Sequence, residues 1–331
     1  MKPRILVIGS NSFSGSSLVK HLIQNGYFVF GTSRRNEIQA PYNPYGVDSN
    51  SNNFIFNKLD LNQDAEKIAN ICFENSIETV INFSAQSMVA ESWERPYEWY
   101  ETNLVSLAKL VQIFVSKKIK ITKFIQFTTP EVYGNISGKL KENFNFAPTT
   151  PYAISRSAGD LHLKAMLDEF QFPVIFTRAA NVYGEHQPNY RIIPKTFITG
   201  LSLGKLDLHG GGVSKRSFIH IDDVSQAILK IIKGGEIGQT YHISTNQIVS
   251  INELVKMCCS IMNIDFDRIC QNVDERPGKD FSYELDSDLI RTKLDWHDEI
   301  NLKDGLLRTH DWVKNNFAMI SSNSNEYEHW K

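Results

Sequence analysis

Tyr152 and Arg156 are four residues apart in the stretch TTPYAISRSAGD (149–160). On a helix this spacing places both side chains on one face. A tyrosine hydroxyl can accept a proton near neutral pH only if its pKa falls, and a nearby cation lowers the pKa by favouring the phenolate. Tyr152 is therefore a candidate proton acceptor, and Arg156 is the candidate cation that would tune it.

A second candidate site lies near the start of the chain, in the stretch GSNSFSG (9–15). Gly9 and Gly15 are placed as the outer glycines of a dinucleotide-binding fingerprint, whose middle position holds Ser12. A small side chain there still allows the backbone to approach a pyrophosphate at a helix N-terminus. The alternative is an ordinary tight turn between a strand and a helix.

Two arginines, Arg34 and Arg35, follow the second strand-like run in GTSRRNE. A site that prefers NAD usually offers a carboxylate here for the ribose hydroxyls, whereas guanidinium groups suit a 2′-phosphate. The pair favours NADP over NAD, unless both arginines are simply solvated. Asp60 would then face the adenine edge.

Strand-like and helix-like segments alternate through the first half of the chain. Helical spacing of apolar residues appears, for example, in 99–118. Continuous apolar strands between amphipathic helices predict α/β structure, namely a Rossmann-type doubly wound parallel sheet covered on both faces. Such sheets bind ligands at the carboxyl ends of their strands. The expected strands are 5–10, 27–33, 54–60, 79–85, 124–130 and 174–180.

Composition narrows the class of function. The chain has 331 residues, 41% of them hydrophobic, and 35 basic against 37 acidic residues, for a net charge of -2. No basic surface for nucleic acid is implied, and no apolar run approaches the length of a membrane span. We expect a cytoplasmic protein that acts on small molecules. The four cysteines show no metal-binding spacing, so we expect no metal site.

Seven motifs occur in an order and spacing that resemble the extended short-chain dehydrogenase/reductase family. Within it, the chain is similar to nucleotide-sugar 4,6-dehydratases, with likeness to both dTDP-glucose and GDP-mannose 4,6-dehydratases. The motifs are GSNSFSG (9–15), NFSAQSMV (82–89), TTPEVYG (128–134), PYAISR (151–156), RAANVYG (178–184), RSFIHIDDV (216–224) and ERPGKD (275–280).

This resemblance implies a set of catalytic roles. Tyr152 would take the proton of the C4 hydroxyl while a nicotinamide takes the C4 hydride, with Arg156 in the place of the usual lysine. Thr129 would hydrogen-bond the reacting oxygen, and Glu131 would remove the C5 proton. Pro130 stands where dTDP-glucose dehydratases carry an aspartate that protonates the departing hydroxyl.

The resemblance also implies binding residues. Those expected at NADP or NAD, besides Tyr152 and Arg156, are Gly9, Asn11, Ser12, Phe13, Ser14, Gly15, Ser33, Arg34, Arg35, Asp60, Leu61, Ser84, Ala85, Gln86 and Asn103. Those expected at the nucleoside-diphosphate sugar are Ser87, Glu131, Asn181, Arg216 and Arg276. The sequence encodes no choice of nucleotide base that we can read.

The expected organisation is a dinucleotide-binding domain (1–180), a smaller α/β nucleotide-sugar lobe (181–316) from which the chain crosses back to the first domain, and a flexible tail (317–331). Apolar faces on helices 97–118 and 153–170 predict a homodimer through a four-helix bundle, as in the family. The main functional prediction is a 4,6-dehydratase. The alternatives are a 4-epimerase or other C4-oxidising enzyme, and a non-catalytic dinucleotide-binding sensor or scaffold.

Overall fold

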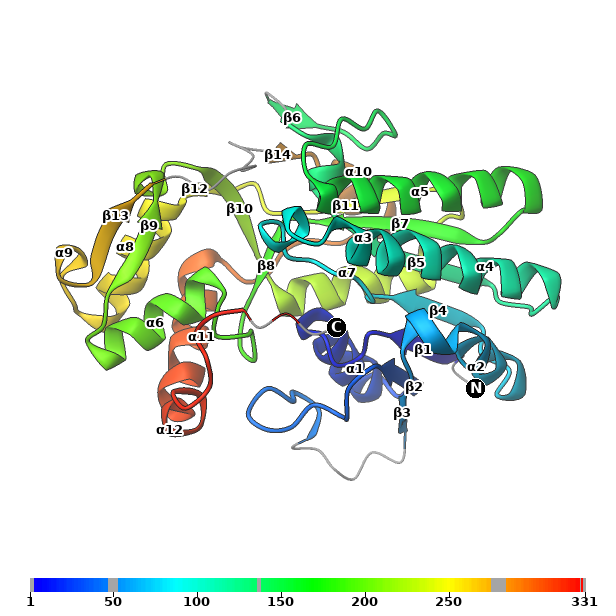
Figure 1. The fold of residues 1–331 in the computed structure, drawn as a ribbon, viewed down its shortest axis with the longest axis horizontal. Coiled ribbons are helices and arrows are strands. Elements are labelled where there is room, and N and C mark those ends of the chain that lie inside the picture. Colours follow the sequence, from blue (N-terminus) through cyan, green and yellow to red (C-terminus); the bar gives the residue numbers. More distant parts are fainter. Residues whose placement is uncertain (1–2, 47–52, 136–137, 275–283, 328, 330–331) are drawn as a thin grey trace.

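The structure is a computed structural model, and it describes residues 3–46, 53–135, 138–274, 284–327 and 329. Its centre is a parallel sheet of seven strands (Figure 1). The order from edge to edge is β11 (Thr240–Ile243), β7 (Val174–Ala179), β5 (Lys123–Thr128), β4 (Thr79–Asn82), β1 (Arg4–Ile8), β2 (Phe28–Ser33) and β3 (Phe54–Lys58). The reversal of strand order beside β1 is typical of doubly wound sheets, which confirms the predicted fold class.

Successive side chains of β1 enter opposite core layers, because neighbouring residues of a strand point to opposite faces. Ile5 and Val7 belong to one hydrophobic cluster, and Leu6 and Ile8 to the other. The first layer is covered by α1 (Phe13–Gln24), α7 (Ile221–Gly234) and α10 (Asp288–Leu294). The second layer is covered by α2 (Leu61–Glu74), α4 (Ser106–Ser116) and α5 (Pro151–Phe170).

The helix expected over 97–118 is divided. It consists of α3 (Pro96–Tyr100), a π-helical turn η3 (Glu101–Val105) and α4. The wider turn coincides with Asn103, whose side chain is buried and bonds to a neighbouring loop and helix. Short turns η2 (Glu91–Trp93) and η4 (Pro130–Tyr133) follow strands β4 and β5.

The second lobe packs around α6, α8 and α11, whose buried residues form a separate hydrophobic cluster. The chain returns from this lobe to supply α7, β11 and α10 to the main sheet, while the division at residue 180 stays a prediction. The remaining elements are α6 (Ile192–Ser202), α8 (Ile251–Met262), α9 (Phe266–Ile269), α11 (Leu302–Asn315), α12 (Phe317–Ile320), η5 (Gly210–Gly212), β6 (Lys139–Leu140), β8 (Asn181–Tyr183), β9 (Leu206–His209), β10 (Lys215–His220), β12 (Ile248–Ser250), β13 (Cys270–Val273) and β14 (Glu284–Leu285).

Candidate active site

The fingerprint turn lies between β1 and α1 and brings the backbone close to the loop after β4. Gly9 has φ of +81°, and a Cβ there would lie 2.8 Å from the Ser84 nitrogen. A Cβ on Gly15 would lie 2.3 Å from the Gly9 carbonyl oxygen. Both positions require glycine, because a side chain would collide with backbone. The turn therefore has the crowded, bare backbone that a pyrophosphate cradle needs.

The serine at the middle position of the fingerprint, Ser12, has a structural role in the turn. It is the N-cap of α1: its hydroxyl accepts a hydrogen bond from the Gly15 nitrogen at 3.0 Å and donates to the Gly9 carbonyl at 2.7 Å. Serine is a favoured N-cap residue. The hydroxyl thus stabilises the turn from within, and the residue is exposed at the helix N-terminus.

Arg34 and Arg35 come directly after β2, at the carboxyl edge of the sheet. Asn11 joins the fingerprint turn to the chain beyond them, since its amide nitrogen donates to the Asn36 carbonyl at 2.8 Å and its oxygen accepts from the Ile38 nitrogen at 3.2 Å. The two arginines are therefore placed beside the turn in which a pyrophosphate would bind.

Two other residues expected at the cofactor, Asp60 and Leu61, make contacts that stabilise the fold. Asp60 is the N-cap of α2, with its carboxylate accepting from the Asn62 nitrogen at 3.0 Å. The side chain of Leu61 is buried in the hydrophobic layer below the sheet. A role for Leu61 at the cofactor would thus have to use its backbone.

Asn103 braces the loop after β4 against α5. Its side-chain oxygen accepts from the Gln86 nitrogen at 2.9 Å, and its amide nitrogen donates to the Gln86 carbonyl at 3.0 Å and to the Ser155 hydroxyl at 2.8 Å. Gly159 of α5 allows this approach, because a Cβ there would lie 2.6 Å from the Asn103 carbonyl oxygen. Of the residues expected here, Ser84 and Ala85 are half-buried and Ser87 is exposed.

The predicted catalytic residues meet where η4 follows β5 and α5 begins. Thr129 is the N-cap of η4, accepting from the Glu131 nitrogen at 3.3 Å, and its hydroxyl also hydrogen-bonds Tyr152. The Tyr152 nitrogen donates to the Ser92 hydroxyl at 3.2 Å, which fixes the first turn of α5. Thr129, Glu131 and Tyr152 are thus held in one small volume by the ends of two elements.

Burial dominates the titration of Tyr152 and raises the pKa of its hydroxyl. Arg156 opposes this shift, Glu131 adds to it, and Thr129 and Arg191 also lower the pKa. The lowering effect expected of Arg156 is present, but it is smaller than the cost of burying a phenolate. A bound oxidised nicotinamide would add positive charge, which favours the phenolate.

Arg156 is almost fully buried, with 4% of its surface exposed. One of its terminal nitrogens donates to the carbonyl of Phe127, close to the end of β5. Its Nε has no hydrogen-bond partner among the described residues. The guanidinium is therefore anchored to β5, and its Nε–H remains available as a donor.

Arg191 is a residue of the site that the sequence did not suggest. It precedes α6 in the second lobe, and its charge lowers the pKa of the Tyr152 hydroxyl. Its guanidinium also lies over the ring of Tyr190, 5.3 Å from the centroid. The charge of Arg191 is therefore within electrostatic range of Tyr152, although Arg191 belongs to the second lobe. No motif marks this position, because the proximity arises only when the lobes meet.

The expected substrate residues of the second lobe are only partly within the described structure. Asn181 begins β8 and pairs with Phe218 of β10, and Arg216 precedes Phe218 by two residues on the same strand. A guanidinium nitrogen of Arg216 donates to the Lys215 carbonyl at 2.8 Å. Asn181 and Arg216 are therefore close neighbours in one small sheet. Arg276 lies outside the described residues.

A buried polar network holds α5 against the neighbouring elements. Arg178 of β7 is fully buried and pairs with Asp160 of α5 at 2.9 Å. It also donates to the Tyr133 hydroxyl at 3.0 Å, and that hydroxyl lies 2.8 Å from His242 Nε2. Removing one partner of a buried ion pair is strongly destabilising, since the other charge is left uncompensated. Arg178 thus fixes α5 relative to η4, the two elements that carry the predicted catalytic residues.

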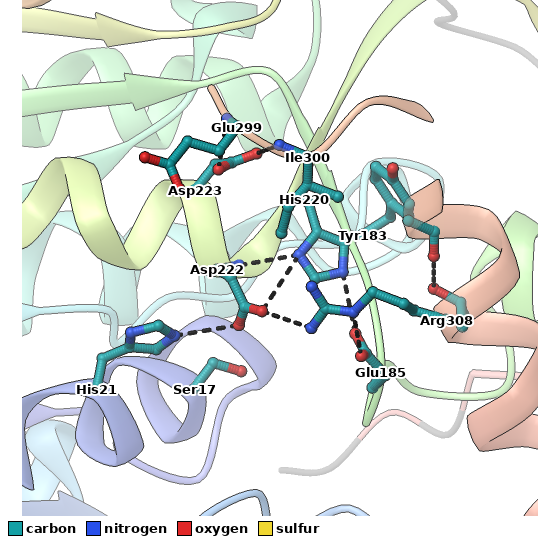
Figure 2. Close-up of polar contacts among 12 residues, drawn as sticks. Ser17, His21, Tyr183, Glu185, His220, Asp222, Asp223, Glu299, Ile300 and Arg308 are labelled. Atoms are coloured by element: carbon teal, nitrogen blue, oxygen red, sulfur yellow. Dashed lines mark hydrogen bonds and ion pairs between the residues drawn. The ribbon is translucent and has the colours of Figure 1, made fainter. Parts of the chain in front are cut away.

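A second polar cluster joins the two lobes (Figure 2). Arg308 of α11 contacts Glu185 at 2.8 Å and Asp222 at 2.6 Å. Asp222, at the start of α7, also contacts His21 of α1 at 3.1 Å, and Glu185 contacts His220 at 3.0 Å. This cluster ties α11 to α1 and α7, and so it sets the position of the second lobe against the sheet.

Among the described residues, no three or more His, Cys, Asp or Glu side chains are grouped to hold a metal ion. The described helices also include none with the length and apolar content of a membrane span. The crowded turn at Gly9 and Gly15 fits a pyrophosphate, with Arg34 and Arg35 beside it.

The parallel sheet, the glycine turn and the Tyr152 centre define a dehydrogenase-type α/β enzyme. A family model described as GDP-mannose 4,6 dehydratase matches residues 6–309, and the chain belongs to this family. The chain is 30% identical over 323 residues to the dTDP-D-glucose 4,6-dehydratase of Bos taurus, an alignment that covers 95% of this chain and 89% of that protein. The predicted resemblance to nucleotide-sugar dehydratases is confirmed.

Solved structures show the same fold. The dTDP-glucose 4,6-dehydratase of Streptomyces venezuelae, determined with NAD bound, is 28% identical with a TM-score of 0.88, covering 95% of this chain and 98% of that one. The UDP-glucuronic acid 4-epimerase of Bacillus cereus, in complex with UDP-glucuronic acid and NAD, is 25% identical with a TM-score of 0.85, covering 94% and 99%.

Proposed function

We propose that the protein is a nucleotide-sugar 4,6-dehydratase, which converts a nucleoside-diphosphate hexose into its 4-keto-6-deoxy form. A bound nicotinamide cofactor would accept the C4 hydride and return it to C6. Tyr152 would take the proton of the C4 hydroxyl, assisted by the hydrogen bond from Thr129. Glu131 would then remove the C5 proton, made acidic by the 4-ketone, and the C6 hydroxyl would leave as water with that proton. A proton from solvent would reach C5 as the hydride adds to C6.

The observation that carries this proposal is the position of Glu131. Its carboxylate is close enough to Tyr152 to raise the pKa of the phenol, and it lies on the same turn as Thr129. Oxidation at C4 needs only the Tyr152 hydroxyl as a base and no carboxylate. Elimination needs an additional base that can reach C5, and Glu131 is the candidate.

Pro130 bears on how the departing hydroxyl is protonated. Proline has no proton to donate, and it occupies the first position of η4, where its fixed φ suits a helix start. Under this proposal Glu131 carries the proton from C5 to the leaving oxygen, so that one carboxyl group performs both transfers.

The test is Glu131→Gln, which keeps the shape of the side chain and removes the base. We expect reduced cofactor to accumulate on addition of substrate, since C4 oxidation remains possible. We also expect no deuterium from solvent at C5 and no 4-keto-6-deoxy product. Glu74→Gln, an exposed change on α2, is the matched control and should behave as wild type.

A 4-epimerase is the second candidate. The similarity to the Bacillus cereus 4-epimerase and the absence of an acid at Pro130 both favour it. An epimerase would invert C4, keep the C6 hydroxyl and incorporate no deuterium at C5. That product from the wild-type protein would contradict the dehydratase and leave Glu131 with a substrate-positioning role.

We further propose NADP as the preferred cofactor, because Arg34 and Arg35 follow β2 at the expected position of the adenosine ribose. The similar structures described above hold NAD, so this preference would be a departure from them. Replacing both arginines by alanine should weaken NADP(H) binding by more than tenfold and NAD(H) binding much less, measured by nicotinamide fluorescence. Lys303→Ala on α11 is the control. A wild-type protein that is purified with NAD would contradict the preference.

We also propose that the protein is a homodimer. A groove of about 560 Å³ runs between α4 and α5, on the side of these helices that faces away from the sheet. Val105 and Phe170 line this groove and are 38% and 55% exposed. Apolar surface in this position is explained if the same helices of a second copy cover it.

A further inference from the structure

The described residues that follow α11 contact both lobes. Ile320 of α12 is fully buried, and its carbonyl accepts from the Asn189 side chain at 2.8 Å. Asn323 then donates to the hydroxyl of Tyr42 at 3.4 Å. In Figure 1 the chain, in red, leaves α12 and runs toward the label C. We call residues 321–327 and His329 the C-terminal segment.

Tyr327 of the C-terminal segment reaches groups from three parts of the molecule. Its ring meets that of Tyr190 in the second lobe edge to face, with centroids 5.3 Å apart. Burial raises the pKa of its hydroxyl, Tyr190 and Glu91 raise it further, and Arg34 and Arg35 lower it. Tyr327 therefore lies within electrostatic range of the two arginines that follow β2.

His329 fastens the end of the segment to α3. Its ring stacks on that of Trp99 at 5.3 Å with an interplanar angle of 12°, and its Nε2 hydrogen-bonds the Glu98 carboxylate. Burial raises the pKa of Glu98, but His329 lowers it and the net shift is downward. These contacts complete a bridge from α12 to the region after β4.

The C-terminal segment contacts three parts of the molecule. They are Tyr190 in the second lobe, Tyr42 in the chain after β2, and Glu98 and Trp99 of α3. Arg34 and Arg35 follow the carboxyl end of β2, the edge at which a dinucleotide binds in such sheets, and they lie within electrostatic range of Tyr327.

We propose that the C-terminal segment forms one wall of the cofactor site, with Tyr327 enclosing the adenosine end beside Arg34 and Arg35. This inference rests on the dinucleotide site of the proposed function, and it is independent of which sugar reaction follows. Release of the cofactor then requires the segment to detach from Tyr190 and α3. The cofactor is thereby retained through many turnovers, as suits a reaction that regenerates it.

The experiment measures cofactor dissociation from the full-length protein. Protein loaded with NADH or NADPH is mixed with excess oxidised cofactor, and the loss of nicotinamide fluorescence gives the rate. Tyr327→Ala, His329→Ala and a deletion of 321–331 are compared with wild type. Ser322→Ala, an exposed change in the same segment, is the control. An aromatic contact contributes about 0.5–1.5 kcal/mol, so each point variant should speed release by roughly two- to tenfold.

The measured release rates distinguish a C-terminal segment that encloses the cofactor from one that does not. Faster release from both point variants and the deletion, with unchanged melting temperatures, supports the proposal. Release at the wild-type rate from all three overturns it. Tighter cofactor binding after deletion also overturns it, because the segment would then compete with the cofactor. No sugar substrate is present, so a failure of the 4,6-dehydratase proposal leaves this test unaffected.

Discussion

Arg156 affects the pKa of Tyr152, the predicted catalytic tyrosine. In the resembled family a lysine ammonium occupies this place as a compact point charge, whereas the guanidinium here is planar and reaches the Phe127 carbonyl. Part of its donor capacity is thereby used to hold α5 against β5. Its charge still lowers the pKa of Tyr152. Arginine in place of lysine therefore anchors α5 to β5 and still lowers the pKa of Tyr152.

Tyr152→Phe tests this residue pair. The change removes the proton acceptor and almost no contact surface, so we expect C4 oxidation to slow by about 10²–10⁴-fold while nucleotide-sugar binding is retained. Single-turnover absorbance of the reduced cofactor reports the first quantity and calorimetry the second. Arg156→Lys is the companion variant and should retain activity if the charge matters most. Unchanged turnover in Tyr152→Phe would remove Tyr152 from the mechanism.

Elements differ in how far the sequence could predict them. Six of the seven strands of the main sheet were predicted because most of their residues are apolar, as burial in a parallel sheet requires, whereas β11 was not predicted. The predicted strands ran too far at their carboxyl ends, as in 79–85 against Thr79–Asn82, because polar binding loops follow there. The order of the C-terminal segment was not predictable from its polar composition, since it depends on Tyr190 and Trp99, far away in the chain.

The same limit applies to the site. Thr129, Glu131 and Tyr152 could be named from motifs, since each lies at the end of a strand or the start of a helix. Arg191 could not, because its proximity to Tyr152 arises from the docking of two lobes. Nor could the sequence show that Ser12 caps α1, which requires its hydroxyl geometry.

The network behind α5 requires a neutral histidine. Arg178 donates to the Tyr133 oxygen, Tyr133 can donate to His242 Nε2, and His242 Nδ1 lies 3.1 Å from the Asp286 carbonyl, to which it can donate. A proton on Nε2 would leave the Tyr133 hydroxyl without an acceptor. Burial, and then the charge of Arg178, lower the pKa of His242 to about 3.

This pKa predicts how stability depends on pH. The unfolded chain binds a proton at His242 near pH 6.5 and the folded protein only near 3, so the unfolded state gains protons first as pH falls. The contribution of His242 to the free energy of unfolding should be fully present above about pH 6.5. It should decrease below that pH by up to roughly 1.4 kcal/mol per pH unit. In His242→Gln, denaturant unfolding should show a flatter dependence between pH 6.5 and 4.5. An unchanged slope would contradict the assignment.

Two carboxylates at the lobe junction extend the acid sensitivity to lower pH. Burial raises the pKa of Glu185, but His220 and Arg308 lower it to a net value of about 2, and the pKa of Asp222 is also depressed. Their contributions are present above about pH 4.5 and are lost as pH falls toward 2. Glu185→Gln should therefore change only the acid end of the profile, which separates the junction from the network of His242.

At the scale of the whole molecule, α4 and α5 each have an inner face and an outer face with different environments. Their inner faces cover the sheet and present Tyr152 and Arg156, while their outer faces form the apolar groove. If a second copy covers this groove, association buries surface directly behind the catalytic helix. The dimer would thus stiffen the element that positions the active site.

A charge placed in the groove tests this arrangement. Val105→Glu and Phe170→Glu should each convert the dimer to a monomer at micromolar concentration, because a buried carboxylate without a partner is costly. Light scattering after size-exclusion chromatography measures the mass. Phe73→Glu, on α2 where the side chain is 71% exposed, is the matched control and should leave the mass unchanged. A monomeric wild-type protein would refute the dimer, and the apolar groove would then need another occupant.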